Sequence, residues 1–408
     1  MSFYKKTIAD LPLHGQIILL RADYNVPLSE ETGEIANDYR IRQSLPTIKY
    51  LLARSCTIVI CSHLGRPNGK VVASLSLEQV AERLADLLGQ KVGFAPVSVG
   101  DQVSQSVKSA GKSSVLLLEN LRFHSGEEAN DASFAEQLAS SARAKYFVQD
   151  GFGVVHRAHA STSAITQFLP SVAGKLIVKE YQHILGAMHN PKRPLIAVIG
   201  GAKTHDKLPL IKRFIEFADG LVIGGAIANT FLKFKGYKVG KSIVDDSLNS
   251  VIASIYELAK QKVGAEGVDD FLLLPSDVAV APSKDRQAMR DEVELDSVKP
   301  DEFILDLGSQ SIEQVTRRVE QAKTVIWNGT LGLAEVPQFA HGSARVAMSL
   351  AENPKITSVI GGGDTTEFVL DWDARDGASF THVSTGGGAS LELMAGEKLP
   401  GVEALIDA

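Results

Sequence analysis

Short apolar segments bounded by turn residues recur along the chain and alternate with segments of helical periodicity. The predicted strands are residues 17–20, 57–61, 115–118, 146–148, 195–199, 221–223, 271–274, 324–327 and 356–360. The predicted helices are residues 39–54, 77–88, 132–140, 248–260 and 312–322. Alternating strands and helices indicate βαβ units, and strands that are apolar throughout fit sheets covered on both faces. We therefore predict an α/β protein with doubly wound, Rossmann-like parallel sheets.

A proline-rich connection divides this pattern. The chain has 408 residues, enough for two or three domains at roughly 150 residues each. Residues 171–188 have the pattern of a helix, and the segment 189–194 that follows contains two prolines, which stop a helix and stiffen a connection. We predict a first domain over residues 1–172, a connecting helix and hinge over 173–190, and a second domain over 191–390.

The composition excludes several classes of protein. Hydrophobic residues make up 44% and charged residues 22%, which rules out a disordered chain, and the net charge of −6 argues against a nucleic-acid binder. We expect no membrane helix and no signal peptide, because no apolar run approaches ~18 residues and the first ten residues lack an apolar region. Cys56 and Cys61 flank an apolar run and form no CxxC motif. They are expected to be buried free thiols in a reducing cytoplasm.

Glycine clusters and Arg/His motifs fall in different halves of the chain. Gly-Gly pairs or triplets at 200–201, 224–225 and 361–363 directly follow predicted strands. A strand end that leads into a helix N-terminus exposes backbone N–H groups and favours an anion. Seven of the ten histidines lie before residue 190, together with the denser Arg/His motifs. The two halves are therefore expected to bind different anionic ligands.

In the first half, polar motifs follow the predicted strands. Asp23 and Asn25 point the same way on an extended chain and would bind hydroxyls and a carboxylate, or else form an Asx-turn before a proline. With Asn37 as N-cap, Arg40 falls in the first helical turn, where a cation is unfavourable unless an anion lies beside it. A solvated Arg40 is the alternative.

Further cations follow other strands. These are His63 with Arg66, Arg122 with a neighbouring histidine, and Arg157. The carboxyl ends of parallel strands form the ligand crevice of open α/β sheets, and the arginine fork matches carboxylate and phosphate geometry. The set predicts an oxyanion-rich ligand.

In the second half, Lys203 and Lys207 follow a Gly-Gly turn at helical spacing, and a polyphosphate between them would relieve their repulsion. Asp364 ends a glycine-rich loop, where it could hold Mg²⁺ or act as an N-cap. Two other motifs fail. Residues 236–242 have three rather than four residues between the glycines of a P-loop, and Gly151 begins a dinucleotide motif without its third glycine.

Taken together, the motifs are RADYNVP, NDYRIRQSLPTI, SHLGRP, ENLRFH, HRAHAST, GGAKTHDK, IGGAIANTFL, VIWNG, GGGDT and HVSTGGGASLELM. In order and spacing they resemble the phosphoglycerate kinase family over essentially the whole chain. The resemblance implies two doubly wound domains joined by a connecting helix and hinge. The first would bind 3-phosphoglycerate or 1,3-bisphosphoglycerate and the second ADP or ATP with Mg²⁺, for reversible phosphoryl transfer. It also implies a tail over residues 391–408 that returns to the first domain.

The resemblance also assigns roles to residues that match the family motifs. The acidic substrate would contact Asp23, Tyr24, Asn25, Arg40, His63, Leu64, Gly65, Arg66, Arg122 and Arg157. The nucleotide would contact Gly201, Ala202, Lys203, Lys207, Gly225, Asn328, Gly332, Glu335, Gly362, Gly363, Asp364 and Thr365. The transfer step would use Arg40, Lys203 and Gly363, and Mg²⁺ would bind Asp364. We expect a cytoplasmic monomer with small-molecule partners and neither nucleic acid nor membrane.

The sequence departs from the family pattern beside the nucleotide motifs. Thr330 stands where the family usually has Pro, Leu331 and Ala334 stand where Met and Phe are usual, and Gly151 replaces Ala. Thr330 and Ala334 are expected to alter nucleotide affinity or base selectivity. Two competing interpretations follow: a non-catalytic relative that serves as a binding or scaffold protein, and a dehydrogenase built on the motif at Gly151.

Overall fold

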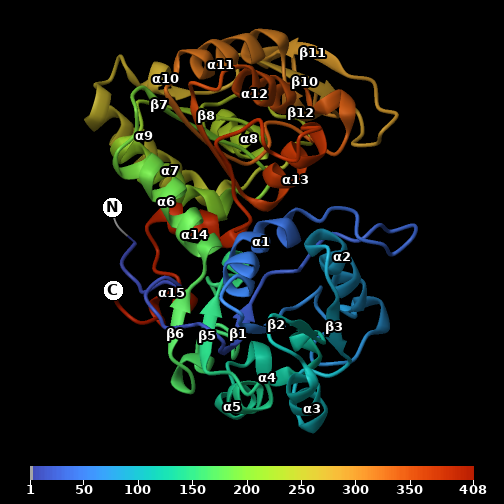
Figure 1. Cartoon of the computed structure of the whole chain (residues 1–408). Coiled ribbons are helices and arrows are strands. Elements are labelled where there is room, and N and C mark those ends of the chain that lie inside the picture. The colour runs from blue at the N-terminus through green and yellow to red at the C-terminus, as the bar shows by residue number, and fades with distance from the viewer. Residues whose placement is uncertain (1–2) are drawn as a thin grey trace. The chain divides into compact units, whose positions relative to one another are not determined.

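The computed structural model describes residues 3–408, which divide into two compact units (Figure 1). The N-terminal unit comprises the chain up to Gln182 together with Glu397–Ala408, and the C-terminal unit comprises His183–Gly396. Helix α6 (Lys175–His189) runs across the division. Each unit is built on a six-stranded sheet whose strands are all parallel, which confirms the predicted α/β class.

The sheet of the N-terminal unit has the strand order β3-β4-β2-β1-β5-β6. Its strands are β1 (Ile17–Arg21), β2 (Thr57–Cys61), β3 (Val92–Ala95), β4 (Val115–Leu118), β5 (Tyr146–Gln149) and β6 (Ser171–Ala173). Its helices are α1 (Tyr39–Leu52), α2 (Glu78–Leu88), α3 (Asp101–Ser109), α4 (Ser125–Glu128), α5 (Ala132–Ser141), the start of α6, and α15 (Pro400–Glu403). Short 3₁₀ helices are η1 (Ala73–Leu75), η2 (Leu121–Phe123), η3 (Phe152–Val154) and η4 (Ala164–Gln167).

Two hydrophobic cores cover this sheet, one on each face. Ile18 and Leu20 of β1 belong to a core with apolar residues of α1 and α2. Leu19, between them, belongs to the opposite core with residues of α3 and α5. Because successive side chains of a strand point to opposite faces, a strand between two cores must be apolar throughout, which explains its continuous hydrophobic sequence.

The main sheet of the C-terminal unit has the order β15-β14-β13-β7-β8-β9. Its strands are β7 (Leu195–Ile199), β8 (Gly220–Ile223), β9 (Leu272–Leu273), β13 (Thr324–Asn328), β14 (Thr357–Gly361) and β15 (His382–Val383). Its helices are α7 (Thr204–Phe217), α8 (Gly225–Phe234), α9 (Asn249–Val263), α10 (Val268–Phe271), α11 (Ser309–Gln321), α12 (His341–Glu352), α13 (Gly363–Trp372) and α14 (Gly388–Ala395). Short 3₁₀ helices are η5 (Asp246–Leu248), η6 (Leu295–Ser297) and η7 (Pro337–Phe339).

A second, antiparallel sheet in this unit has no counterpart among the sequence predictions. It has the order β11-β10-β12, formed by β10 (Asp277–Ala281), β11 (Asp291–Glu294) and β12 (Phe303–Leu307). Leu232 of α8 packs with Val278 and Val280 of β10 in a separate core cluster. Helix α8 therefore contacts the small sheet as well as following β8 of the main sheet, and this arrangement places both sheets around one cavity.

The predicted strands agree with the structure where they are fully buried, as in β2, β7 and β13. One prediction is wrong at its start: residues 171–188 are not one helix, because Ser171–Ala173 pair with β5 as strand β6 before α6 begins at Lys175. The predicted strand at 271–274 is also shorter. Phe271 is the last residue of α10, and only Leu272–Leu273 form β9.

The chain ends against the first part of the sequence. Lys6 N donates to Ile406 O at 2.8 Å, and Gly401 N donates to Val155 O at 2.8 Å. The return to the N-terminal unit begins at Glu397, later than the predicted tail start at 391, because α14 belongs to the C-terminal unit. Cys56 and Cys61 are buried free thiols, as predicted. No helix within residues 3–408 has the length and apolarity that crossing a membrane requires.

Candidate functional site

The N-terminal motifs meet at one edge of their sheet. β1, β2 and β4 are adjacent and parallel, so the segments that follow them lie together. Tyr24 N donates to Ser62 Oγ at 2.8 Å, and Gly65 N donates to Asn25 Oδ1 at 2.8 Å. Arg122 Nη1 donates to Gly65 O at 2.8 Å. Backbone and side-chain hydrogen bonds thus tie three separate loops into a single cluster.

Asp23, which is buried, forms an ion pair in this cluster with the partly exposed Arg40. Arg40 Nη1 donates to Asp23 Oδ2 at 2.7 Å, and the Asp23 side chain is only 3% exposed. Asp23 Oδ1 accepts from Asn25 N at 3.1 Å, which is the Asx-turn that the sequence left as an alternative. The carboxylate therefore holds Arg40 and the loop in place, and the Arg40 side chain remains 27% exposed toward solvent.

The start of α1 differs slightly from its prediction. The N-cap is Asp38 rather than Asn37, although Asn37 Oδ1 accepts from Tyr39 N at 2.8 Å. Arg40 still lies in the first helical turn. Asp38 pairs with Arg42 and Arg83. Partial burial raises the pKa of its carboxyl, but the two arginines outweigh this effect and the pKa is lowered. In this turn Arg42 pairs with Asp38, whereas Arg40 pairs with Asp23 of the cluster.

The other predicted cations differ in how they are held. Arg122 is 4% exposed and pairs with Glu128 at 3.2 Å. Arg66 is exposed and Arg157 is half-buried, and within residues 3–408 neither has an acidic partner. Two arginine forks are therefore available to an anion. The side chains of Tyr24 and Leu64, also predicted to bind substrate, are buried in the core, so only their backbone could face a ligand.

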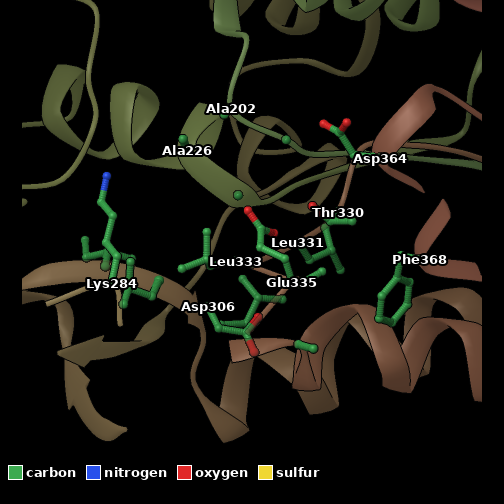
Figure 2. Close-up of a pocket in the computed structure, with 18 of the residues that line it drawn as sticks. Ala202, Ala226, Lys284, Asp306, Thr330, Leu331, Leu333, Glu335, Asp364 and Phe368 are labelled. Atoms are coloured by element: carbon green, nitrogen blue, oxygen red, sulfur yellow. The ribbon is translucent and has the colours of Figure 1, made fainter. Parts of the chain in front are cut away.

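The C-terminal unit contains a cavity of about 790 Å³ between the main sheet, α8 and the small sheet (Figure 2). Six of the predicted nucleotide-binding residues line it: Gly201, Ala202, Gly225, Gly332, Glu335 and Asp364. The other six do not line it: Lys203, Lys207, Asn328, Gly362, Gly363 and Thr365. The volume suits a small-molecule ligand of nucleotide size.

Close backbone contacts at the carboxyl ends of β7, β8 and β13 shape one end of the cavity. Gly201 N donates to Thr330 O at 2.8 Å, and Gly225 N donates to Leu331 O at 2.9 Å. Gly225 has φ +60°, and a Cβ atom there would lie 2.6 Å from Gly201 N. A side chain at 225 would push these loops apart, so only glycine permits this approach.

The glycine-rich loop before α13 leads into a helix N-terminus, where a phosphate could bind. Gly362 is the N-cap, α13 begins at Gly363, and Asp364 is exposed at the helix start. Thr365 Oγ1 accepts from Gly329 N at 2.6 Å, which joins this loop to the end of β13. Asn328 is fully buried, yet among residues 3–408 neither Oδ1 nor Nδ2 has a hydrogen-bond partner. A buried carboxamide without partners is costly unless a ligand supplies them.

The two lysines at the start of α7 differ in exposure. Lys203 is the N-cap of α7 and is exposed, whereas Lys207 lies inside the helix and is 8% exposed. Burial lowers the pKa of the Lys207 ammonium to about 8, although Asp364 and Asp206 oppose the shift. A phosphate beside Lys207 would favour its charged form.

The chain offers only part of a metal site. Asp364 is exposed and accepts no hydrogen bond from residues 3–408. Among those same residues, no three His, Cys, Asp or Glu side chains gather into a metal-binding group. One carboxylate fits Mg²⁺ that arrives on nucleotide phosphates, since this ion is usually held by one or two carboxylates, waters and phosphates.

Sequence reasoning missed the wall of the cavity that comes from the small sheet. Phe303, Leu305 and Asp306 of β12 line it, together with Asn229 of α8. Asp306 is buried and pairs with Arg290 at 3.0 Å, but burial raises the pKa of its carboxyl to about 6. A lone aspartate in the otherwise apolar sequence FILDL was the signal that could have identified it.

Asp306 also explains why residue 332 is glycine. A Cβ atom on Gly332 would lie 2.5 Å from Asp306 Oδ1 and 2.4 Å from Phe339 O. Gly342 N donates to Asp306 Oδ2 at 3.2 Å, so the carboxylate also holds the start of α12. Gly332 therefore lets the loop that carries Glu335 lie directly over the buried carboxylate (Figure 2).

Two parallel α/β units, one with an arginine-rich cluster at its strand ends and one with a glycine-lined, nucleotide-sized cavity, define a phosphotransferase that acts on a small anion. The family model described as phosphoglycerate kinase matches residues 8–397, and the chain belongs to that family. The phosphoglycerate kinase of Dictyoglomus turgidum is 42% identical over 406 residues, covering 99% of each chain. That of Chloroherpeton thalassium is 44% identical over 407 residues, covering 99% of this chain and 100% of the relative.

Solved structures agree with this assignment. The phosphoglycerate kinase from Coxiella burnetii superposes with a TM-score of 0.82 at 33% identity, over 98% of both chains. The enzyme from Pyrococcus horikoshii OT3 gives the same TM-score at 28% identity, over 99% of this chain and 98% of that one. The similarity in sequence and in fold therefore extends along both units.

Proposed function

We propose that this chain catalyses reversible phosphoryl transfer between 1,3-bisphosphoglycerate and ADP, giving 3-phosphoglycerate and ATP. Membership of the phosphoglycerate kinase family over residues 8–397 carries this conclusion. Two features in separate units support the proposal: arginines without an acidic partner in residues 3–408, for an acidic metabolite, and a glycine-lined cavity, for a nucleotide. The scaffold and dehydrogenase interpretations are not favoured, since the relatives that match along nearly the whole chain are phosphoglycerate kinases.

The acidic substrate is assigned to the cluster of the N-terminal unit. Arg66 and Arg157 lack acidic partners within residues 3–408, and Arg40 keeps a quarter of its side chain exposed despite its pairing with Asp23. Phosphate and carboxylate groups of a phosphoglycerate would offset these charges through bidentate hydrogen bonds. Arg122 and His63 lie beside them as further donors.

The nucleotide is assigned to the cavity of the C-terminal unit. The loops at Gly201 and Gly225 would lie against the phosphates, and Glu335 would accept hydrogen bonds from ribose hydroxyls. Lys207 would neutralise phosphate charge, and the unpartnered carboxamide of Asn328 would complete the same end. Mg²⁺ carried by the nucleotide would bind Asp364 and supply positive charge to the phosphates.

The reaction needs positioning and charge rather than a general base. The acceptor in the ATP-consuming direction is a carboxylate, which is already ionised at neutral pH. Catalysis then depends on orienting the two substrates and on stabilising the equatorial oxygens of the transferring phosphoryl group. We assign that stabilisation to Arg40, Lys203 and the N–H groups at Gly363, the first residue of α13. Lys203 is exposed at the N-terminus of α7, where an ammonium can reach a ligand.

The proposal extends to the partners, the oligomeric state and the cellular location of the protein. Small-molecule substrates, a monomeric chain and a cytoplasmic location fit the net charge of −6 and the buried free thiols Cys56 and Cys61. Light scattering on the purified protein tests the oligomeric state. A dimer would contradict the proposed monomer without affecting the reaction.

A coupled assay with ATP, Mg²⁺ and 3-phosphoglycerate tests the function. Wild-type turnover is expected to fall by ~10²–10³ in kcat for Arg40→Ala and for Lys203→Ala, because each removes one cation from the transition state. The exposed Arg143→Ala serves as the control and should keep wild-type turnover. A folded wild type without turnover would refute the function. A Lys203→Ala variant within threefold of wild type would refute that assignment alone.

A further inference from the structure

Arg21 contacts His63 of the N-terminal cluster, but the assignments above give Arg21 no ligand. It is the last residue of β1 and is only 1% exposed. Its Nε donates to Ser161 Oγ at 2.7 Å, and Nη1 donates to Ala22 O. Its Nη2 lies 3.3 Å from His63 Nδ1. A buried arginine that contacts a substrate-site histidine, and not the solvent, can act on the substrate through that histidine.

The chemistry of the guanidinium decides which nitrogen of His63 carries the proton. Arginine has five N–H donors, no acceptor, and is always charged in proteins. His63 Nδ1 must therefore accept from Arg21, so that its lone pair is occupied and the proton of the neutral ring is on Nε2. Asp23 does not place the proton on Nδ1 instead. Its Oδ1 is 3.9 Å from His63 Nδ1, too far for a hydrogen bond, and Asp23 already accepts from Arg40 and from Asn25 N.

Arg21 is itself held by a buried carboxylate. Glu127 is fully buried, and its Oε1 lies 3.7 Å from Arg21 Nη2. Ser161 bridges the two, because its hydroxyl donates to Glu127 Oε1 at 2.6 Å while accepting from Arg21 Nε. Ser161 N also donates to Glu127 Oε2 at 3.1 Å. Glu127 and Ser161 therefore fix the guanidinium, and the guanidinium fixes the imidazole.

We propose that Arg21 is a positioning residue that keeps His63 as a neutral ring protonated on Nε2, which gives the acidic substrate a hydrogen-bond donor that does not change charge with pH. The inference rests on the proposed assignment of 3-phosphoglycerate to this cluster. The role differs from that of the neighbouring arginines, because Arg21 would not touch the substrate. Glu127 and Ser161 share the role through their hold on Arg21.

The charges around His63 act in the same direction. Burial lowers the pKa of His63 well below its ordinary value, and the cations Arg21, Arg122 and Arg40 and the neighbouring His159 lower it further. Asp23 is the acidic group that faces the ring. A second positive charge on His63 would be placed beside Arg21, so the neutral ring persists through mildly acidic pH.

Nitrogen NMR of ¹⁵N-histidine-labelled wild-type protein without substrate tests the proposal directly. The His63 signals, assigned by their loss in His63→Gln, should show unprotonated Nδ1 and protonated Nε2 from about pH 5.5 to 8. A proton on Nδ1, or titration of the ring within that range, would overturn the proposal. The measurement needs no turnover, so it is independent of whether the proposed reaction is correct.

Variants then test the link to the substrate. Arg21→Met with Glu127→Leu removes both buried charges together, which avoids leaving either one unpaired. We expect the Nε2–H preference to be lost and the KM for 3-phosphoglycerate to rise ~10-fold, with the KM for ATP unchanged. Arg21→Lys, which still only donates, should restore the tautomer. The exposed Arg143→Met is the matched control. An unchanged tautomer in the double variant would refute the role of Arg21, and if that variant does not fold, the wild-type spectrum decides.

Discussion

Asp150 provides a stability test whose size follows from the structure. It follows β5, is fully buried, and its Oδ1 accepts from Leu176 N at 2.9 Å in the first turn of α6. Burial raises the pKa of its carboxyl from 3.8 to about 7, although hydrogen bonds from Thr47 and the start of α6 oppose the shift. Each pH unit between the two values is worth about 1.4 kcal/mol, so ionisation costs the native state about 4 kcal/mol.

The sign follows from proton binding. Between the two pKa values the native state keeps the Asp150 proton, while the unfolded state has released it, so the free energy of unfolding falls as pH rises from about 4 to 7. Asp150→Asn removes the ionisation. Its buried NH₂ group adds a cost that is the same at every pH, and this cost cancels in a comparison across pH. Relative to wild type, the variant should gain about 3–4 kcal/mol between pH 4 and pH 8.

Guanidinium unfolding at several pH values measures this difference. Circular dichroism reports the whole chain, and tryptophan emission reports the C-terminal unit alone, since Trp327 and Trp372 both lie there. The matched control is Asp86→Asn, whose side chain is 74% exposed and which should show no comparable gain. If the Asp150→Asn difference is constant with pH, the argument that burial raises the pKa of Asp150 is wrong.

Three further predictions concern the nucleotide cavity. Gly332→Ala places a Cβ atom 2.5 Å from Asp306 Oδ1, so the nucleotide KM should rise ~10-fold or more in the coupled assay, whereas Gly186→Ala, with open space around it, should not change it. ADP should bind more weakly above pH 8, as Lys207 loses its proton, and calorimetry on Lys207→Arg should remove that dependence; an identical pH profile in the variant would count against Lys207. Asn328→Leu should keep the wild-type melting temperature, because its amide makes no hydrogen bond within the described residues, but should weaken ADP binding; a lower melting temperature with unchanged binding would contradict this.

The fold was predictable where burial alone dictates the residue type. β2 and β13 lie in the middle of their sheets and are buried along their whole length, so their sequences are continuous apolar runs. Among the strands that were missed, β10 is itself a buried run, DVAVA, but two others carry no such signal. β11 has the sequence DEVE and is largely exposed, and β3 contains a glycine and is half-buried. Pairing with a neighbouring strand defines these segments, and pairing is not visible in a local sequence pattern.

β6 shows the same limit. Ser171–Ala173 have apolar spacing that also fits the first turn of a helix, and the sequence prediction assigned them to one. Ser171–Ala173 pair with β5, and Asp150 accepts a hydrogen bond from Leu176 N in the first turn of α6. These two interactions place the boundary between strand and helix at Gly174. A Cβ atom on Gly174 would lie 2.1 Å from Asp150 Oδ1, so the glycine is required by a residue 24 positions away in the chain.

The sequence by itself determined the α/β class, the family and the motifs that carry charge, because strand periodicity, glycine turns and arginine spacing are local properties of the chain. The tertiary structure alone decided what each of these charges does. It paired Asp23 with Arg40 and buried Arg21 against His63. Within the described part of the chain it left Arg66 and Arg157 without acidic partners. It also brought the small antiparallel sheet to the nucleotide cavity. These outcomes depend on distances between residues far apart in the chain, and burial and pairing over such distances set the charge and pKa of a side chain.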